Sequence, residues 1–380
     1  MNIRTQVIHG GHQVDPQTGA VNMPIYQTTT FKQTELGGGA KWEYTRSENP
    51  TRASLEELIA SLEHGTAGFA FSSGMSAIHA VMSTLSAGDH ILLADDVYGG
   101  TFRLVNSILA RLGITYDQVD MADLPAVTSA FKANTKMIFL ETPTNPLLKL
   151  ADIQALSLIA HNYQATLAVD NTFATPYNQV PLDLGADFVV HSGTKYIGGH
   201  SDVLSGFVVT NDDRHSAEIK HLQMSIGATL GASDSYLVLR SLKTFALRMR
   251  AHNDNAQALF NWLQTQSQVA KIYYPGDASS AQYAIAQKQM HGGFGGMISV
   301  ELQAGLDVKK FVESLKIFTL AESLGGVESL VEVPAVMTHA SISADIRHEH
   351  GITDELIRIS VGIEDSQDLI ADFQQGLAQL

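Results

Sequence analysis

Residues 188–196 read Phe-Val-Val-His-Ser-Gly-Thr-Lys-Tyr, so a short apolar run ends at Val190 and is followed by small polar residues and one lysine. An apolar run of this length is typical of a strand that is buried on both faces. Similar runs recur between residues 66 and 230 and alternate with stretches of helical periodicity. We expect strands near Phe69–Phe71, Ile91–Ala94, Met137–Leu140, Thr166–Val169, Phe188–Val190 and Phe207–Val209. Helices are expected at Ala77–Leu85, Phe102–Leu112 and Ile153–Tyr163.

This alternation predicts an α/β fold with a mostly parallel central sheet that is covered by helices on both faces. Ligands of such sheets bind beyond the carboxyl ends of the strands. The polar residues that follow Val190 therefore indicate where a functional site should lie.

The chain on either side of this region has a different pattern. Residues 1–65 are rich in Gly, Thr, Asn and Gln and are expected to form an extended arm. A helical pattern over residues 234–264 predicts one long connecting helix that leads into a smaller C-terminal α+β domain. Within that domain we expect strands at Met297–Leu302 and Leu356–Val361 and helices at Val308–Leu315 and Asp368–Leu377. The predicted units are the arm at 1–65, a large domain at 66–232, and the connecting helix with the C-terminal domain at 233–380.

The composition excludes several classes of function. The chain has 380 residues, with 24 Lys and Arg against 39 Asp and Glu, and a net charge of −15 disfavours binding to nucleic acid or to anionic membranes. It contains no cysteine, which excludes disulfides, thiolate metal sites and a cysteine nucleophile. No H-E-x-x-H motif is present, and no metal is expected. Without a membrane-spanning or signal segment, the sequence predicts a soluble, cytoplasmic protein.

Three polar features follow predicted strands. Lys195 is placed where a partly desolvated amine is suited to forming a Schiff base. Asp170 could pair with a protonated ring nitrogen. Residues 72–76, Ser-Ser-Gly-Met-Ser, lie between a strand and a helix, where free backbone N–H groups can bind a phosphate. Taken singly, each has an ordinary structural explanation: a lysine in a surface turn, a turn-forming aspartate and an N-cap serine.

Taken together, the three features provide a phosphate site, an acidic partner and a lysine, which are the groups that pyridoxal 5′-phosphate (PLP) requires. Tyr98 follows a further predicted strand and could stack on the pyridine ring. Residues 72–76 match neither the Walker pattern nor G-x-G-x-x-G, so a nucleotide is not implied. The sequence therefore predicts a PLP site.

Several ordered blocks of the chain resemble one family of PLP enzymes. The blocks are Tyr44-Thr45-Arg46 with Asn49-Pro50-Thr51, Ser72-Ser73-Gly74-Met75, Glu141-Thr142-Pro143-Thr144-Asn145-Pro146, Val169-Asp170-Asn171-Thr172, Ser192-Gly193-Thr194-Lys195-Tyr196 and Arg358-Ile359-Ser360-Val361-Gly362. They are similar to the Cys/Met-metabolism family, which contains cystathionine γ-synthase, cystathionine β-lyase, cystathionine γ-lyase and methionine γ-lyase. The resemblance spans essentially the whole chain. It implies the PLP-dependent transferase fold of type I (aspartate aminotransferase-like) and a homo-oligomer, at least a dimer and, as in the family, a homotetramer.

The resemblance also implies roles for individual residues. Lys195 would be the Schiff-base lysine and the proton shuttle, Asp170 would bind the pyridine nitrogen, and Tyr98 would stack on the ring and assist proton transfer. The phosphate would be bound by Gly74, Met75, Ser192 and Thr194 and by Tyr44 and Arg46 of the partner subunit. Arg358 would hold the substrate α-carboxylate, supported by Asn145 and Ser323. Candidate contacts for the distal part of the substrate are Glu322, Glu43 and Arg103.

Two positions bear on the activity that the resemblance implies. Gly100 stands where methionine γ-lyases have Cys, and Glu322 stands where γ-lyases and γ-synthases have Glu. We therefore expect a PLP-dependent carbon–sulfur lyase of the cystathionine γ-lyase type, which cleaves L-cystathionine by α,γ-elimination to cysteine, 2-oxobutanoate and ammonia.

Two alternatives remain open. The first is cystathionine γ-synthase, which catalyses γ-replacement on an O-acylhomoserine with cysteine; cystathionine β-lyase chemistry is expected as a side activity. The second is a non-catalytic PLP-binding regulatory protein. The presence of Lys195, Asp170 and Arg358 and the negative net charge disfavour the second alternative.

Overall fold

A seven-stranded sheet forms the centre of the protein, with the strand order β1-β7-β6-β5-β4-β2-β3. The computed structural model describes residues 1–11, 14–15, 17–37, 39–340 and 343–380. Neighbouring strands from β6 to β3 are parallel, whereas β7 runs antiparallel to both β1 and β6. The strands are β1 (Ala67–Phe71), β2 (His90–Ala94), β3 (Thr115–Val119), β4 (Thr135–Glu141), β5 (Thr166–Asp170), β6 (Phe188–Ser192) and β7 (Gly206–Thr210). The predicted mostly parallel sheet is therefore confirmed.

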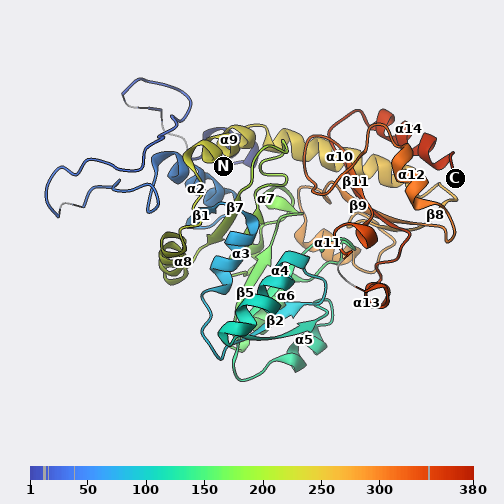
Figure 1. Cartoon of the computed structure of the whole chain (residues 1–380), viewed down its shortest axis with the longest axis horizontal. Coiled ribbons are helices and arrows are strands. Elements are labelled where there is room, and N and C mark those ends of the chain that lie inside the picture. Colours follow the sequence, from blue (N-terminus) through green and yellow to red (C-terminus); the bar gives the residue numbers. More distant parts are fainter. Residues whose placement is uncertain (12–13, 16, 38, 341–342) are drawn as a thin grey trace.

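Helices cover both faces of this sheet (Figure 1). Consecutive side chains of β7 point to opposite faces, so Val208 packs in one core while Phe207 and Val209 pack in another. The first core contains α3 (Gly74–Met82) and part of α8 (Asp213–Ile226), and the second contains α2 (Pro50–Leu62) and α9 (Ala232–Leu242). The remaining helices and helical turns of the first 230 residues are α1 (Ile3–His9), α4 (Gly99–Arg103), η1 (Leu104–Leu109), η2 (Ala110–Leu112), α5 (Leu124–Ala130), α6 (Ile153–Asn162), α7 (Thr175–Asn178) and η3 (Pro181–Leu184).

A smaller five-stranded sheet, ordered β10-β11-β12-β9-β8, builds the C-terminal region. Helix α10 (Phe245–Leu263) connects the two parts, because its first turns pack in the core of the large sheet and its last turns in that of the small sheet. The strands are β8 (Val269–Tyr273), β9 (Met297–Leu302), β10 (Thr319–Leu320), β11 (Leu330–Glu332) and β12 (Leu356–Ser360). The helices are α11 (Tyr283–Gln289), α12 (Val308–Ser314), η4 (Pro334–Val336), α13 (Ala344–Glu349) and α14 (Ser366–Leu377).

Three sequence-based expectations differ from the structure. The predicted arm is not extended throughout, since it contains α1 and α2, and α2 begins with Pro50 behind the N-cap Asn49. The single helix expected over 234–264 is two helices, because the chain turns at Lys243 and Thr244. The Ser241 carbonyl next to this turn accepts a hydrogen bond from the Arg248 guanidinium at 3.2 Å. The helix expected over 102–112 begins as α4 and continues through a π-helical segment, η1, into the 3-10 turn η2.

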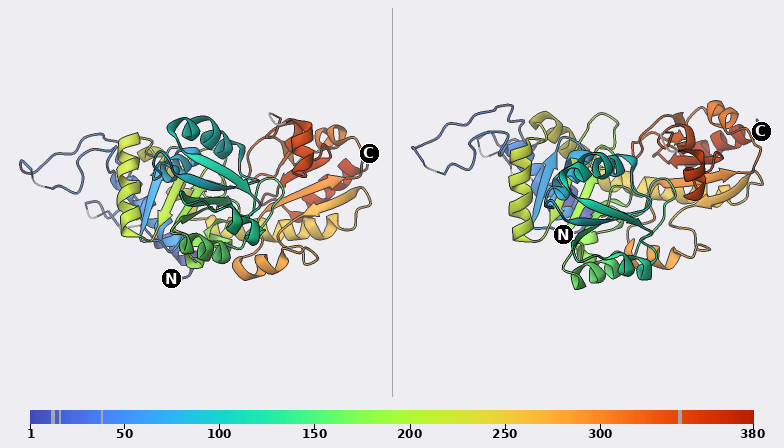
Figure 2. Two further views of the ribbon diagram at one scale, coloured as in Figure 1. Left: turned by 90° about the horizontal axis from the view of Figure 1, so that it is seen from below. Right: turned by 60° about the horizontal axis from the view of Figure 1, so that its bottom comes forward.

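Part of the segment between α1 and α2 extends away from the body, at the end opposite the small sheet (Figure 2). Residues 12–13, 16 and 38 of the predicted arm lie outside the described residues. The division of the chain at residues 65 and 232 stays a prediction. None of the helices within the described ranges combines the length and the apolar character that crossing a membrane requires.

Candidate active site

The carboxyl ends of β4, β5 and β6 line a cavity of about 310 Å³. It collects residues from the large sheet, from the start of α3 and from the loops of the small sheet. Of the residues singled out in the sequence, the cavity is lined by Gly74, Met75, Tyr98, Asn145, Asp170, Ser192, Thr194, Lys195, Glu322, Ser323 and Arg358. Positions spread over nearly 300 residues of sequence therefore meet in one place.

Lys195 is one of the charged residues that line this cavity. Its Nζ donates a hydrogen bond to Ser323 Oγ at 2.7 Å. Burial, and after it the nearby Arg358 guanidinium, lower the pKa of Lys195 from 10.5 to about 8, while Glu332 and Glu322 act in the opposite direction. Ser323 has a φ of 85°, in the left-handed region, which is costly for a serine and concentrates at functional sites. The structure thus holds a lysine whose neutral amine is accessible near physiological pH.

Asp170 ends β5 beside a second buried carboxyl group, Glu141, which ends β4 directly opposite it in the sheet. Burial and the charge of Asp170 raise the pKa of Glu141 well above its usual value. Burial also raises the pKa of Asp170, but two hydrogen bonds from Thr172 to Asp170 Oδ1 and the charge of His191 favour its ionised form. Of the two, Glu141 therefore keeps its proton to higher pH, and Asp170 is the group that ionises more readily. Within the described ranges, Asp170 Oδ2 accepts no hydrogen bond from the protein.

The start of α3 is pressed against the ends of β6 and β7. Ser73 caps the helix by accepting a hydrogen bond from the Ser76 N–H at 3.1 Å. A Cβ at Gly74 would lie 2.8 Å from Ser192 Cβ, and one at Gly206 would lie 2.1 Å from the Ser73 carbonyl oxygen. Only glycine at these two positions lets the positive end of the helix approach the hydroxyl groups at the end of β6. This surface is suited to an anionic group.

Arg358 on β12 is buried, with 3% of its surface exposed, and faces Glu332 in the antiparallel register with β11. Its guanidinium lies 2.9 Å from Glu332 Oε1 and donates to Asn145 Oδ1 at 2.9 Å and to the Ser323 carbonyl at 2.8 Å. These partners fix the plane of the guanidinium within the cavity wall. Glu332 was not predicted from the sequence; the signal for it was a glutamate inside the apolar run at residues 330–333.

Tyr98 lies at the mouth of the cavity with 43% of its surface exposed. Its backbone N–H donates to Glu141 Oε1 at 2.6 Å. A Cβ at Gly100 would lie 2.4 Å from Tyr98 Cε1 and 2.8 Å from Met75 Sδ. Because glycine has no side chain, position 100 leaves room for the Tyr98 ring.

The structure does not place four of the predicted residues, Glu43, Tyr44, Arg46 and Arg103, in the cavity of their own chain. Arg46 donates a hydrogen bond to the Met224 carbonyl at 2.8 Å, with its guanidinium 5.7 Å from the centre of the Tyr44 ring. Arg103 is exposed at the end of α4. Tyr44 and Arg46 were expected to act on a partner subunit, so a single chain leaves that prediction untested.

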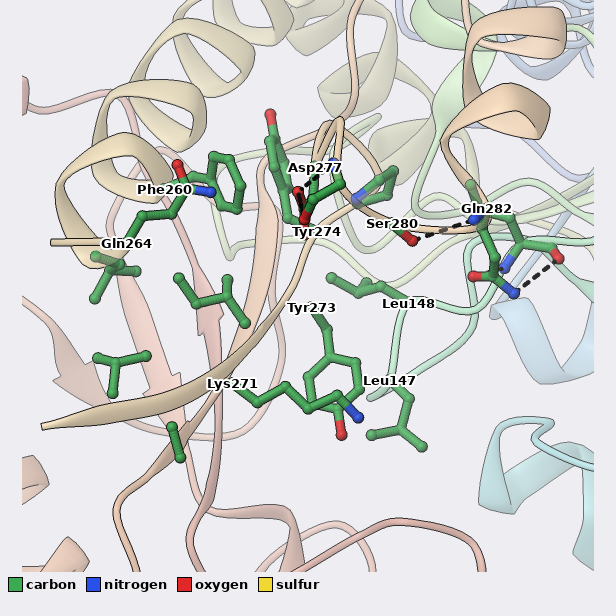
Figure 3. A pocket seen from close by; sticks show the side chains of 17 residues that line it. Leu147, Leu148, Phe260, Gln264, Lys271, Tyr273, Tyr274, Asp277, Ser280 and Gln282 are labelled. Carbon is green, nitrogen blue, oxygen red and sulfur yellow. Dashed lines mark hydrogen bonds between the residues drawn. The ribbon is translucent and has the colours of Figure 1, made fainter. Parts of the chain in front are cut away.

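A second, larger cavity of about 590 Å³ lies beside β8 and the end of α10 (Figure 3). Leu147, Phe260 and Tyr274 supply apolar walls, and Lys271 is its one lining cation within the described residues. It contains none of the residues that the sequence analysis singled out. Because the smaller cavity has the reactive amine, the paired carboxyl groups and the arginine, we take that one as the site of chemistry. No group of three or more His, Asp or Glu side chains in the described ranges is placed to hold a metal ion.

Comparison with known proteins places this site in a family. The chain matches the family described as Cys/Met metabolism PLP-dependent enzyme over residues 4–378. The chain belongs to this family. Its central sheet and smaller second sheet agree with the fold that the sequence predicts, and membership confirms PLP as the cofactor and a carbon–sulfur lyase or closely related enzyme as the class. The non-catalytic alternative is correspondingly disfavoured.

Individual relatives are similar over their full length. The chain is 59% identical over 376 residues to a cystathionine beta-lyase of Lactococcus lactis subsp. cremoris, covering 99% of each chain. It is 50% identical over 380 residues to a cystathionine gamma-lyase of Bacillus subtilis, covering 100% of both. The crystal structure of a cystathionine gamma-lyase from Lactobacillus plantarum complexed with L-serine superposes with a TM-score of 0.97 at 53% identity, covering 100% of this chain and 99% of that one.

The residues of the cavity fit PLP. Asp170 Oδ2 is available to a ring N–H, and the glycine-lined approach of α3 to Ser192 provides donors for a phosphate. The Lys195 amine opens into the same cavity. The three requirements of the cofactor are therefore met by one chain at adjacent strand ends.

Proposed function

We propose that this chain cleaves L-cystathionine by α,γ-elimination to cysteine, 2-oxobutanoate and ammonia. The observation that carries the proposal is the presence, in one cavity, of a lysine of lowered pKa, a fixed arginine and the carboxylate of Glu322. Such a set suits a long amino acid with a carboxylate at one end and an ammonium group at the other. The Bacillus and Lactobacillus relatives are both named cystathionine gamma-lyase, which agrees with the proposed substrate and with cleavage of its γ-carbon–sulfur bond.

Each residue has a defined part in the proposal. Arg358 binds the α-carboxylate through its planar fork, and its contacts with Asn145 and Ser323 keep that fork in place. Lys195 removes the proton from Cα and, for departure of the γ-sulfur, moves protons at Cβ. Bound PLP supplies the electron sink for the negative charge that develops at Cα. Glu322, exposed at the rim, receives the distal ammonium group.

A second candidate is α,β-elimination of the same substrate, which would give homocysteine, pyruvate and ammonia. The similarity to the Lactococcus protein named cystathionine beta-lyase favours it. Both reactions begin with the same proton transfer by Lys195, so the geometry around Cα suits both.

Product analysis distinguishes the reactions. The holoenzyme is incubated with L-cystathionine, and separately with O-acetylhomoserine plus cysteine, and the keto acid and thiol are identified by mass spectrometry. 2-Oxobutanoate with cysteine is the expected result, whereas pyruvate with homocysteine alone would contradict γ-elimination. Net formation of cystathionine in the second mixture would favour the γ-synthase alternative. Lys195→Ala should abolish turnover and change the absorbance of bound PLP, and an unchanged spectrum would contradict the assigned lysine.

We further propose that the active unit is a homo-oligomer in which Tyr44 and Arg46 complete the phosphate site of the partner subunit, with a homotetramer as the expected assembly. Support comes from the projecting segment before α2, which carries both residues (Figure 1). Mixing inactive Arg46→Ala and Lys195→Ala subunits should restore activity, since hybrid dimers contain one intact site. A mixture as inactive as its components would contradict shared sites. The cytoplasmic location stays a prediction.

A further inference from the structure

The residues that line the cavity at the strand ends have chain neighbours on the opposite, buried face of the sheet. Asp170 and Ser192 line the cavity, whereas their chain neighbours Asn171 and His191 do not. Because side chains alternate along a strand, these neighbours point to the opposite face of the sheet. There they are buried, with 0% of Asn171 and 1% of His191 exposed.

One carboxylate joins these two residues. Glu63, which ends α2, is fully buried, and its Oε1 accepts a hydrogen bond from Asn171 Nδ2 at 2.8 Å. The same oxygen lies 2.6 Å from His191 Nε2. A single atom therefore bridges the ends of β5 and β6, although Glu63 is more than 100 residues away from both in sequence.

The network continues to the third strand end. Gln179 Nε2 donates to Asn171 Oδ1 at 3.0 Å and to the Thr142 carbonyl at 3.1 Å, and Asn171 Nδ2 donates to the Gln179 carbonyl at 2.9 Å. Thr142 directly follows Glu141 at the end of β4. The buried chain Thr142–Gln179–Asn171–Glu63–His191 thus runs behind the three positions that present Glu141, Asp170 and Ser192 to the cavity.

We propose that Glu63 is a positioning residue for the cofactor site: by holding Asn171 and His191 to one carboxylate, it fixes the spacing between Asp170 and Ser192. The inference rests on the proposed assignment of these two residues to PLP. A ring partner and a phosphate partner must keep a set separation, because the cofactor is rigid between its nitrogen and the carbon that bears its phosphate arm. The network holds this separation from the face of the sheet that lies away from the cavity.

Two further observations favour a positioning role over a purely stabilising one. Glu63 Oε2, His191 Nδ1 and Gln179 Oε1 have no hydrogen-bond partner among the described residues, so the network does not pair every buried polar atom of its members within the protein. His191, whose Nε2 lies 2.6 Å from Glu63 Oε1, also acts to lower the pKa of Asp170. Glu63 is therefore linked to the position of the ring partner and, through His191, to a group that affects the pKa of that partner.

The test compares PLP binding in folded variants without substrate. Glu63→Gln keeps the size and the acceptor for Asn171 but removes the charge that faces His191. We expect the PLP dissociation constant to rise at least about tenfold, equivalent to about 1.4 kcal/mol. In turnover assays kcat should fall while the substrate KM changes less than about twofold, because Arg358 lies on the other sheet.

A matched control separates positioning from general loss of stability. Asp372 is also a buried carboxylate and accepts backbone hydrogen bonds from Lys316, Ile317 and Phe318, but it belongs to the small domain. Asp372→Asn should lower the melting temperature and leave the PLP dissociation constant unchanged. Equal PLP affinity in Glu63→Gln and the wild type would overturn the proposal.

His191→Gln provides the second variant, since it retains a donor for Glu63. It should also raise the PLP dissociation constant. Because Glu63 and His191 act as a unit, the double variant should have about the same PLP dissociation constant as whichever single variant binds PLP more weakly. Additive effects of the two substitutions on PLP binding would contradict the assignment. Failure of both single variants to fold would also contradict it, since the network would then be required for folding itself. Because PLP binding is measured without cystathionine, a wrong substrate assignment cannot produce or hide these results.

Discussion

Lys195 is expected to lose its proton at a far lower pH than an ordinary lysine. Its pKa falls from 10.5 to about 8, first because the amine is buried and second because Arg358 lies close to it. A lower pKa means that the neutral amine is reached at lower pH. At pH 7 the neutral fraction is about 9% for a pKa of 8 and about 0.03% for a pKa of 10.5, so the structure predicts roughly 300-fold more reactive amine.

Competitive acetylation of the PLP-free protein measures this directly. The protein is labelled with limiting acetic anhydride between pH 6 and pH 11, and the modification of Lys195 is followed by mass spectrometry. Lys309, whose side chain is 80% exposed, serves as the internal reference for the reagent. Partial burial of Lys195 lowers its absolute rate at every pH but leaves the inflection pH unchanged, and we expect that inflection near pH 8.

An inflection at pH 10 or above would refute the reasoning. The causes can be separated by two variants that change one charge each. Arg358→Gln removes a cation and should move the Lys195 inflection to higher pH, whereas Glu322→Gln removes a carboxylate and should move it to lower pH. If neither variant moved the inflection, the assigned electrostatic neighbours would be wrong even if the wild-type value agreed.

Three further results are expected. Gly74→Ala puts a methyl group 2.8 Å from Ser192 Cβ, so it should lower the free energy of unfolding by about 1–3 kcal/mol, measured by calorimetry, and weaken PLP binding, measured by dialysis. Gly99→Ala is the control: no atom lies within 4 Å of its added Cβ, and it should have neither effect. Arg358→Lys keeps the charge but loses the fork, so the KM for cystathionine should rise by about tenfold or more, and an unchanged KM would disprove carboxylate binding there. Asn49→Ala removes the acceptor for two N–H groups at the start of α2 and should lower stability in urea by about 1–2 kcal/mol, and unchanged stability would contradict the capping role.

The parts of the fold that could be predicted are those with a local signal. Strands such as β4 and β5 are apolar along their length because they are covered on both faces, and the run itself marks them. β3 and β8 are edge strands with partly exposed residues, and neither contains a continuous apolar run that would distinguish it from a loop. The start of α2 was predictable, since Asn49 followed by Pro50 is an N-cap signature.

The same distinction applies to the candidate site. Lys195, Asp170 and Gly74 each follow an apolar strand, so their place at one edge of a sheet could be inferred from the chain alone. Glu332 and Glu63 could not, because each acts through partners that are distant in sequence and are brought near by strand register or by helix packing. A single glutamate in an apolar stretch carries no information about which residue it will meet.

The balance of charge in the cavity explains why these acids matter. Its lining brings Glu141, Asp170 and Glu322 together with only two cations, Lys195 and Arg358, among the described residues. A phosphate would add negative charge near the start of α3, where the chain itself offers hydroxyl and N–H groups but no guanidinium. The raised pKa of Glu141 favours its neutral form, and a cationic ring nitrogen at Asp170 would neutralise a further negative charge. The negative charge of the phosphate would then lack a cationic partner within the chain. In the proposed homo-oligomer, Arg46 of the partner subunit provides that cation.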